Sequence, residues 1–130
     1  MLQVFKENKA LPITKVKLLE VGMVDKFNEG AMIKISGLSK GKGFQGVVKR
    51  YRFKGASKTH GTKHALRQPG SIGATWPQRV IKGKRMAGRM GGERITLKNK
   101  EILNINKEQG ELMIKGSLPG NRGSLLEIRI

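Results

Sequence analysis

The residues best suited to chemistry are lysines and arginines that alternate with glycines in two clusters. The first cluster spans residues 39–46 (SKGKGFQG), and the second spans residues 82–92 (KGKRMAGRMGG). Glycine lets backbone N–H groups approach a phosphate closely, and the flanking cations neutralise that phosphate. Both clusters therefore predict contacts with nucleic-acid phosphates. The simpler alternative is a flexible cationic linker.

Aromatic residues lie between these charged residues in the sequence. A flexible cationic linker has no use for aromatic side chains, so their presence favours a binding segment. Guanidinium groups pair with phosphates and stack on bases, and aromatic rings stack on unpaired bases. Trp76, the only tryptophan, is either a plug packed against Ile72 and Val80 or a base-stacking tip, and both interpretations stay open. The candidate nucleic-acid-binding residues are Lys40, Lys42, Phe44, Lys49, Arg50, Arg52, Lys54, Lys58, His60, Lys63, His64, Arg67, Trp76, Arg79, Lys82, Lys84, Arg85 and Arg89.

The charge of the chain is concentrated in its middle. Residues 31–92 contain fifteen Lys and Arg, twelve of the eighteen glycines and no Asp or Glu, within a total net charge of +18. A segment of this kind cannot neutralise itself by internal ion pairs, so we expect it to be disordered alone and ordered on a polyanion. Nucleic acid is the leading partner, with anionic membrane and heparin-like polymers as lesser options.

Signals for other chemistry are weak. The chain has no cysteine, which excludes disulfides and thiolate metal sites. His60 and His64 are four residues apart without an acid nearby, so we predict solvated or RNA-facing histidines and no metal. The SKGKG run lacks the GxxxxGKS or GxxxxGKT order of a phosphate-binding loop, and no nucleophile stands beside a base. We therefore predict no enzymatic activity, no cofactor and no small-molecule substrate.

Hydropathy gives no sign of a membrane protein. No apolar run approaches the length needed to cross a bilayer, and the N-terminal residues lack the apolar block of a signal peptide. We expect a soluble, intracellular protein.

The two ends of the chain show the alternating pattern of strands. The predicted strands are residues 2–6, 13–18, 32–35, 94–97, 101–106, 111–115 and 125–130. Hairpins are expected across residues 2–19, with Pro12 at the start of the second strand, and across residues 101–115. Short helices are expected at residues 43–52 and, on a weaker pattern, at residues 84–90.

These elements predict a mainly β fold with a single domain. Residues 1–37 and 93–130 would form a small antiparallel six-stranded barrel body. The basic segment, residues 38–92, would be a long, largely irregular extension inserted between two strands.

Several motifs follow one another in a fixed order along residues 30–130. After SKGKGFQG come His60-Gly61, PGSIG at residues 69–73, KGKRMAGRMG at residues 82–91, ERIT at residues 93–96 and KGSLPG at residues 115–120. This series resembles the ribosomal protein L3 family of the large subunit. The opening, residues 3–14, resembles the first hairpin of that family, but a long stretch that usually precedes residue 27 is absent. The chain is thus similar to a shortened member.

The resemblance implies a translation-protein-like barrel on the subunit surface and a basic extension that runs through large-subunit rRNA toward the peptidyl-transferase centre. It also implies a role in early subunit assembly beside neighbouring large-subunit ribosomal proteins, in a cytoplasmic or organellar ribosome, with catalysis left to RNA. Two other hypotheses remain. A nucleic-acid chaperone or architectural DNA binder fits the charge, although no helix of groove-reading length is apparent. An enzyme would have to rest on the weak histidine and phosphate-loop signals.

Overall fold

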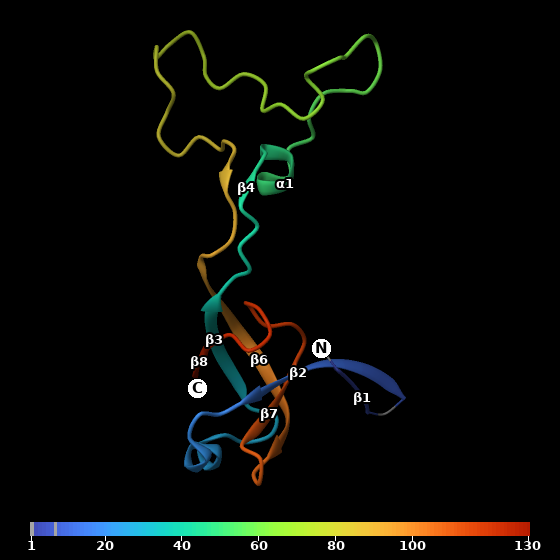
Figure 1. The fold of residues 1–130 in the computed structure, drawn as a ribbon, viewed down its shortest axis with the longest axis vertical. Helices are drawn as coiled ribbons and strands as arrows, with labels where there is room; N and C mark the ends of the chain where they lie inside the picture. Colours follow the sequence, from blue (N-terminus) through green and yellow to red (C-terminus); the bar gives the residue numbers. More distant parts are fainter. Residues whose placement is uncertain (1, 7) are drawn as a thin grey trace. The chain divides into compact units, whose positions relative to one another are not determined.

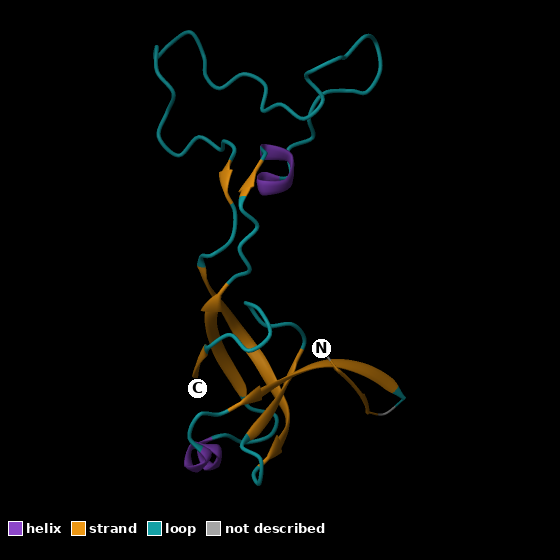
Figure 2. Ribbon diagram, in the orientation of Figure 1, coloured by secondary structure: helices purple, strands orange, loops and turns teal. Residues whose placement is uncertain are grey.

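The computed structural model describes residues 2–6 and 8–130, and their fold is mainly β (Figures 1 and 2). The chain divides into two compact units. We call residues 1–40 with 93–130 the sheet body and residues 41–92 the arm. No helix in the part of the chain that the structure describes is long and apolar enough to cross a bilayer.

The sheet body contains one antiparallel six-stranded sheet. Its strands are β1 (Leu2–Lys6), β2 (Lys9–Lys17), β3 (Met32–Leu38), β6 (Arg94–Asn106), β7 (Glu111–Lys115) and β8 (Leu126–Arg129), in the order β1-β2-β7-β6-β3-β8 (Figure 1). The prediction of a mainly β, antiparallel six-stranded body is confirmed. The pairings recorded among the described residues do not join β1 to β8, so closure into a barrel stays a prediction.

The core of this sheet comes from alternate positions of its central strands. Ile33, Ile35, Ile102, Leu112 and Ile114 are at most 1% exposed and form one cluster. Because side chains of a strand alternate between its two faces, residues two apart on β3 and on β7 reach the same core. The period-2 pattern of the sequence had predicted these faces.

Strand β6 is longer than the sequence suggested. The predicted runs at residues 94–97 and 101–106 belong to one strand, because a β-bulge absorbs the polar residues between them. The register against β3 shifts between Ile33 and Ile35, and Asn99 has a φ of 55°. A bulge of this kind bends a strand without ending its pairing.

The predicted first hairpin is confirmed as β1 and β2, with one change. Pro12 lies inside β2 and pairs with Gln3, whereas the sequence placed it at the start of the strand. Proline lacks only a donor, and the Pro12 carbonyl still accepts a hydrogen bond from the Gly116 N–H at 2.8 Å. The expected hairpin also includes residue 7, which lies outside the described residues. A six-residue 3₁₀ helix, η1 (Val21–Lys26), lies between β2 and β3 in the chain.

The arm holds three short elements: β4 (Phe44–Gln45), α1 (Val47–Tyr51) and β5 (Gly88–Arg89). The helix predicted over residues 43–52 is confirmed for the five residues of α1 only, because Phe44 and Gln45 pair with β5 instead. The helical turn predicted over residues 84–90 is wrong. Backbone bonds to the β4 segment hold residues 88–90 extended.

Candidate nucleic-acid interface

The two glycine and cation clusters of the sequence lie side by side in the arm. Phe44 pairs with Arg89, the Lys42 N–H donates to the Met90 carbonyl at 2.8 Å, and the Met90 N–H donates to the Gly43 carbonyl at 2.9 Å. Gly43 has a φ of 66°, a conformation that glycine adopts without steric cost. We call residues 42–45 and 88–90 the neck of the arm. It brings Lys42, Phe44 and Arg89 together although they are far apart in sequence.

Arg50 on α1 holds the neck from one side. Its Nη1 donates to the Met86 carbonyl at 2.8 Å. A Cβ atom at residue 88 would lie only 2.8 Å from that Nη1, so Gly88 leaves the space that the guanidinium fills. Arg50 therefore helps to position the neck, and one of its five N–H donors is already used inside the arm.

Tyr51 is a functional candidate that the sequence reasoning left out of the site. The guanidinium carbons of Arg50 and Arg85 lie 4.9 and 5.7 Å from the centre of its ring, within cation–π range. The ring of Phe53 lies 6.4 Å away at a tilt of 44°. Tyr51 thus holds two cations near one aromatic pair. Its place between two arginines in the sequence was the signal that could have found it.

The candidate residues are almost all open to solvent. Lys40 belongs to the sheet body, and the other seventeen belong to the arm. Arg50 is half-buried and the rest are exposed. Beyond the neck, the segment without regular structure carries Arg52, Lys54, Lys58, His60, Lys63, His64, Arg67, Trp76, Arg79, Lys82, Lys84 and Arg85. Because residues 41–92 contain no acid, the lysines and arginines of this segment have no carboxylate partner within the arm.

Trp76 does not form a buried plug. Its side chain is 80% exposed, and Ile72 and Val80 are 44% and 41% exposed. Trp76 lines an open hollow of about 340 Å³ together with Ile72, Ile81, Arg79 and Lys84. An exposed ring is able to stack on a base, and base stacking by Trp76 stays a prediction.

The histidines do not form a metal site with neighbouring acids. His60 and His64 are both exposed. Among residues 2–6 and 8–130, no three His, Asp or Glu side chains gather as a ligand set.

Loss of the Arg50 guanidinium is expected to loosen the neck. In Arg50→Ala, the exchange of the Lys42 and Met90 amide hydrogens should speed up about fivefold, because a charge-assisted hydrogen bond of roughly 1 kcal/mol is lost. Hydrogen exchange followed by NMR measures this directly. Lys49→Ala, an exposed change on the same helix, is the matched control. Equal exchange rates in the two variants would show that Arg50 does not hold the neck.

Comparison with known proteins gives one consistent result. The sequence profile of the family described as Ribosomal protein L3 matches residues 9–112. The large ribosomal subunit protein uL3 of Chlorobium limicola is 52% identical over 106 residues, which cover 81% of this chain and 51% of that protein. The uL3 proteins of Chloroherpeton thalassium (52% over 103 residues, 78% and 50% covered) and Clavibacter michiganensis (50% over 107 residues, 82% and 49% covered) are similar.

The chain thus spans about half the length of the curated relatives that it matches. The match nonetheless covers most of the chain, including the neck and the arm. The protein belongs to the ribosomal protein L3 family.

Proposed function

We propose that this chain is a structural component of the large ribosomal subunit and that residues 38–92 bind large-subunit rRNA. The observation that carries the proposal is the exposed set of cations in an arm that contains no acid. Such a segment gains its neutralising charge from a polyanion, and family membership points to rRNA as that polyanion. No catalytic role is assigned to any residue.

The proposed roles differ along the arm. Lysines and arginines of the irregular segment neutralise phosphates, and this segment becomes ordered on RNA. Phe44 and Trp76, which are 76% and 80% exposed, stack on unpaired bases. The neck presents Lys42 and Arg89 from its two strands. Arg50 acts indirectly, by holding the neck together.

The family resemblance supports four finer parts of the proposal. The sheet would close into a six-stranded barrel at the subunit surface. The arm would run toward the peptidyl-transferase centre. The protein would act early in subunit assembly, in contact with neighbouring large-subunit proteins. Its site of action would be the ribosome, in the cytoplasm or in an organelle.

Salt-dependent binding tests the proposal. The full chain is titrated against large-subunit rRNA fragments and against duplex DNA from 50 to 300 mM salt. Each neutralised phosphate steepens the plot of log K against log [salt] by about 0.7 to 0.9 units, so we expect a steep slope together with a strong preference for one rRNA fragment. A steep slope with equal affinity for duplex DNA would contradict the ribosomal assignment and support a general nucleic-acid binder.

A further inference from the structure

One face of the sheet body carries its own group of cations, separate from the arm. On β3, the side chains of Ile33 and Ile35 enter the core, so Lys34 and Ser36 lie on the opposite, outer face. The register places Thr96 of β6, Ser36 of β3 and Glu127 of β8 in one row across the three strands.

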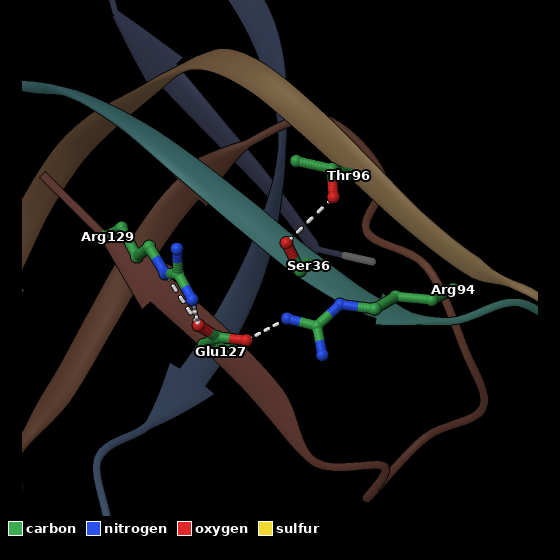
Figure 3. A network of polar contacts seen from close by, with 5 residues as sticks. All are labelled: Ser36, Arg94, Thr96, Glu127 and Arg129. Atoms are coloured by element: carbon green, nitrogen blue, oxygen red, sulfur yellow. Dashed lines mark hydrogen bonds and ion pairs between the residues drawn. The ribbon is translucent and has the colours of Figure 1, made fainter.

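Hydrogen bonds join the members of this row and their neighbours (Figure 3). The hydroxyl groups of Ser36 and Thr96 lie 2.9 Å apart, and Ser36 is only 8% exposed. Glu127 forms ion pairs with Arg94 and with Arg129, whose Nε donates to Oε1 at 2.6 Å. Hydrogen bonds from Arg129 and then from Arg94 lower the pKa of Glu127, so its carboxylate is ionised at neutral pH.

One carboxylate therefore holds two guanidinium groups that remain open to solvent. The side chains of Arg94 and Arg129 are 60% and 67% exposed. The carboxylate of Glu127 accepts hydrogen bonds from only one edge of each guanidinium group. Each guanidinium group has five N–H donors, so both arginines keep donors for another acceptor. Glu127 thus fixes the direction of both arginines without neutralising the pair.

Two lysines add to the charge of this face. Lys34 lies directly across from Arg129 in the register, an arrangement of like charges that destabilises a sheet. Alternation from Thr96 puts Lys98 on the same face, beside the bulge at Asn99. We call Lys34, Arg94, Lys98 and Arg129 the cationic face. Glu127 is the acid paired within it.

Three other cations of the sheet body are each paired with a single acid. The structure pairs Lys15 with Glu111, Lys115 with Glu101 and Lys107 with Asp25. In the cationic face, by contrast, one acid is shared by two arginines, and the like charges of Lys34 and Arg129 lie opposite each other. An anionic partner would neutralise the charge that Glu127 leaves uncompensated on this face.

A phosphodiester backbone fits this surface best. The cations follow neighbouring strands, so they form a flat array and not a closed pocket for one small anion. Arginine forks pair with phosphate oxygens. Met32 and Leu38 share the outer face of β3 and are 58% and 62% exposed, which provides apolar surface for ribose and base edges.

We propose that the cationic face is a second RNA-backbone site, located in the sheet body, and that Glu127 is a positioning residue that holds Arg94 and Arg129 ready for phosphates. The inference rests on the proposed function only in taking RNA as the polyanion.

Lysine footprinting tests the site in the full chain. The protein, alone and bound to the large-subunit rRNA fragment that it prefers, is treated with an amine-acetylating reagent, and each lysine is read by mass spectrometry. Polyuridylate serves as a second probe. We expect acetylation of Lys34 and Lys98 to slow at least fivefold on RNA binding. Lys26, the exposed last residue of η1, should change less than twofold.

The same spectra separate the two proposals. Protection of Lys82 and Lys84 in the arm without protection of Lys34 and Lys98 by either probe would overturn the cationic face and leave the proposed function standing. Protection of Lys34 and Lys98 with unprotected arm lysines would support the cationic face and contradict the role of the arm.

The direction in which RNA affinity changes in a Glu127 variant tests the positioning role of this residue. Glu127→Gln raises the net charge by one, so charge alone predicts tighter RNA binding. Release of Arg94 and Arg129 predicts the reverse: about threefold weaker binding and a salt slope shallower by about 1 unit. Glu108→Gln, an exposed acid in the β6–β7 turn, makes the same charge change as a control. If Glu127→Gln binds RNA as tightly as Glu108→Gln, the positioning role is overturned.

Discussion

Replacing Ile114 with alanine is expected to lower the free energy of unfolding of the sheet body by about 3 kcal/mol. Ile114 is 0% exposed, lies on the central strand β7 and pairs with Ile102 of β6. Its opposite neighbour in the register is Thr14 of β2, so its side chain is enclosed from both adjacent strands. The truncation removes buried methyl and methylene groups and leaves a cavity that the surrounding strands can only partly close.

Urea unfolding followed by far-ultraviolet circular dichroism measures this loss. Tryptophan fluorescence is the wrong probe, because Trp76 lies in the arm and is 80% exposed. Ile130→Ala is the matched control: the chemical change is the same, but Ile130 is 77% exposed, so the loss should stay below about 0.5 kcal/mol. Equal losses in the two variants would mean that the sheet is not packed around Ile114.

The same variant separates stability from binding. Below its unfolding midpoint, Ile114→Ala retains every cation of the arm and of the cationic face. Its salt slope for RNA should therefore match that of the unchanged protein. A weaker RNA complex under conditions where the variant is fully folded would show that the core also shapes the binding surface.

The strands of the sheet body could be predicted well from the sequence. In a strand with one buried face, apolar and polar residues alternate, and this alternation is visible within a few consecutive residues. In ELMIK at residues 111–115, Leu112 and Ile114 are fully buried, whereas the residues that alternate with them, Glu111, Met113 and Lys115, are not. The bulge at Asn99 was missed for a related reason. A bulge interrupts the alternation, so the sequence pattern of one continuous strand looks like that of two.

The neck of the arm could not be predicted from local pattern. Strands β4 and β5 have two residues each, and they are held by backbone bonds between segments more than forty residues apart. Glycine contributes no side chain to a hydrophobic pattern. The helix expected at residues 84–90 rested on the spacing of Met86 and Met90. In the structure, the carbonyl groups of these two residues accept hydrogen bonds from Arg50 and Lys42.

The arm was visible as a binding segment because its charge is continuous along the chain. The cationic face was hidden for the opposite reason. Its residues come from β3, β6 and β8. The two sequence segments of the sheet body also contain acids, which offset much of the positive charge of their lysines and arginines. Only the register shows that Lys34 lies across from Arg129 and that Glu127 serves two arginines.

Reversing the charge of the second glycine and cation cluster is expected to cause the largest loss of RNA affinity. The triple variant Lys82→Glu, Lys84→Glu and Arg85→Glu removes about three phosphate contacts from an arm with no acid of its own. The slope of log K against log [salt] should become shallower by about 2 units. Between 1 M and 0.1 M salt, a difference of that size amounts to about a hundredfold in affinity. Fluorescence anisotropy with the preferred rRNA fragment measures both quantities.

The control must carry the same net charge, because any polycation binds RNA less tightly when six units of charge are lost. Lys6→Glu, Lys9→Glu and Lys26→Glu make that change at exposed positions of the sheet body, outside the cationic face. If the arm is the binding element, this control keeps most of its affinity and most of its slope. Equal losses in the two triple variants would mean that total charge alone drives binding. Incorporation of the arm variant into large subunits at the normal level would contradict the ribosomal role of the arm even more directly, since the proposed contact would then be dispensable for assembly.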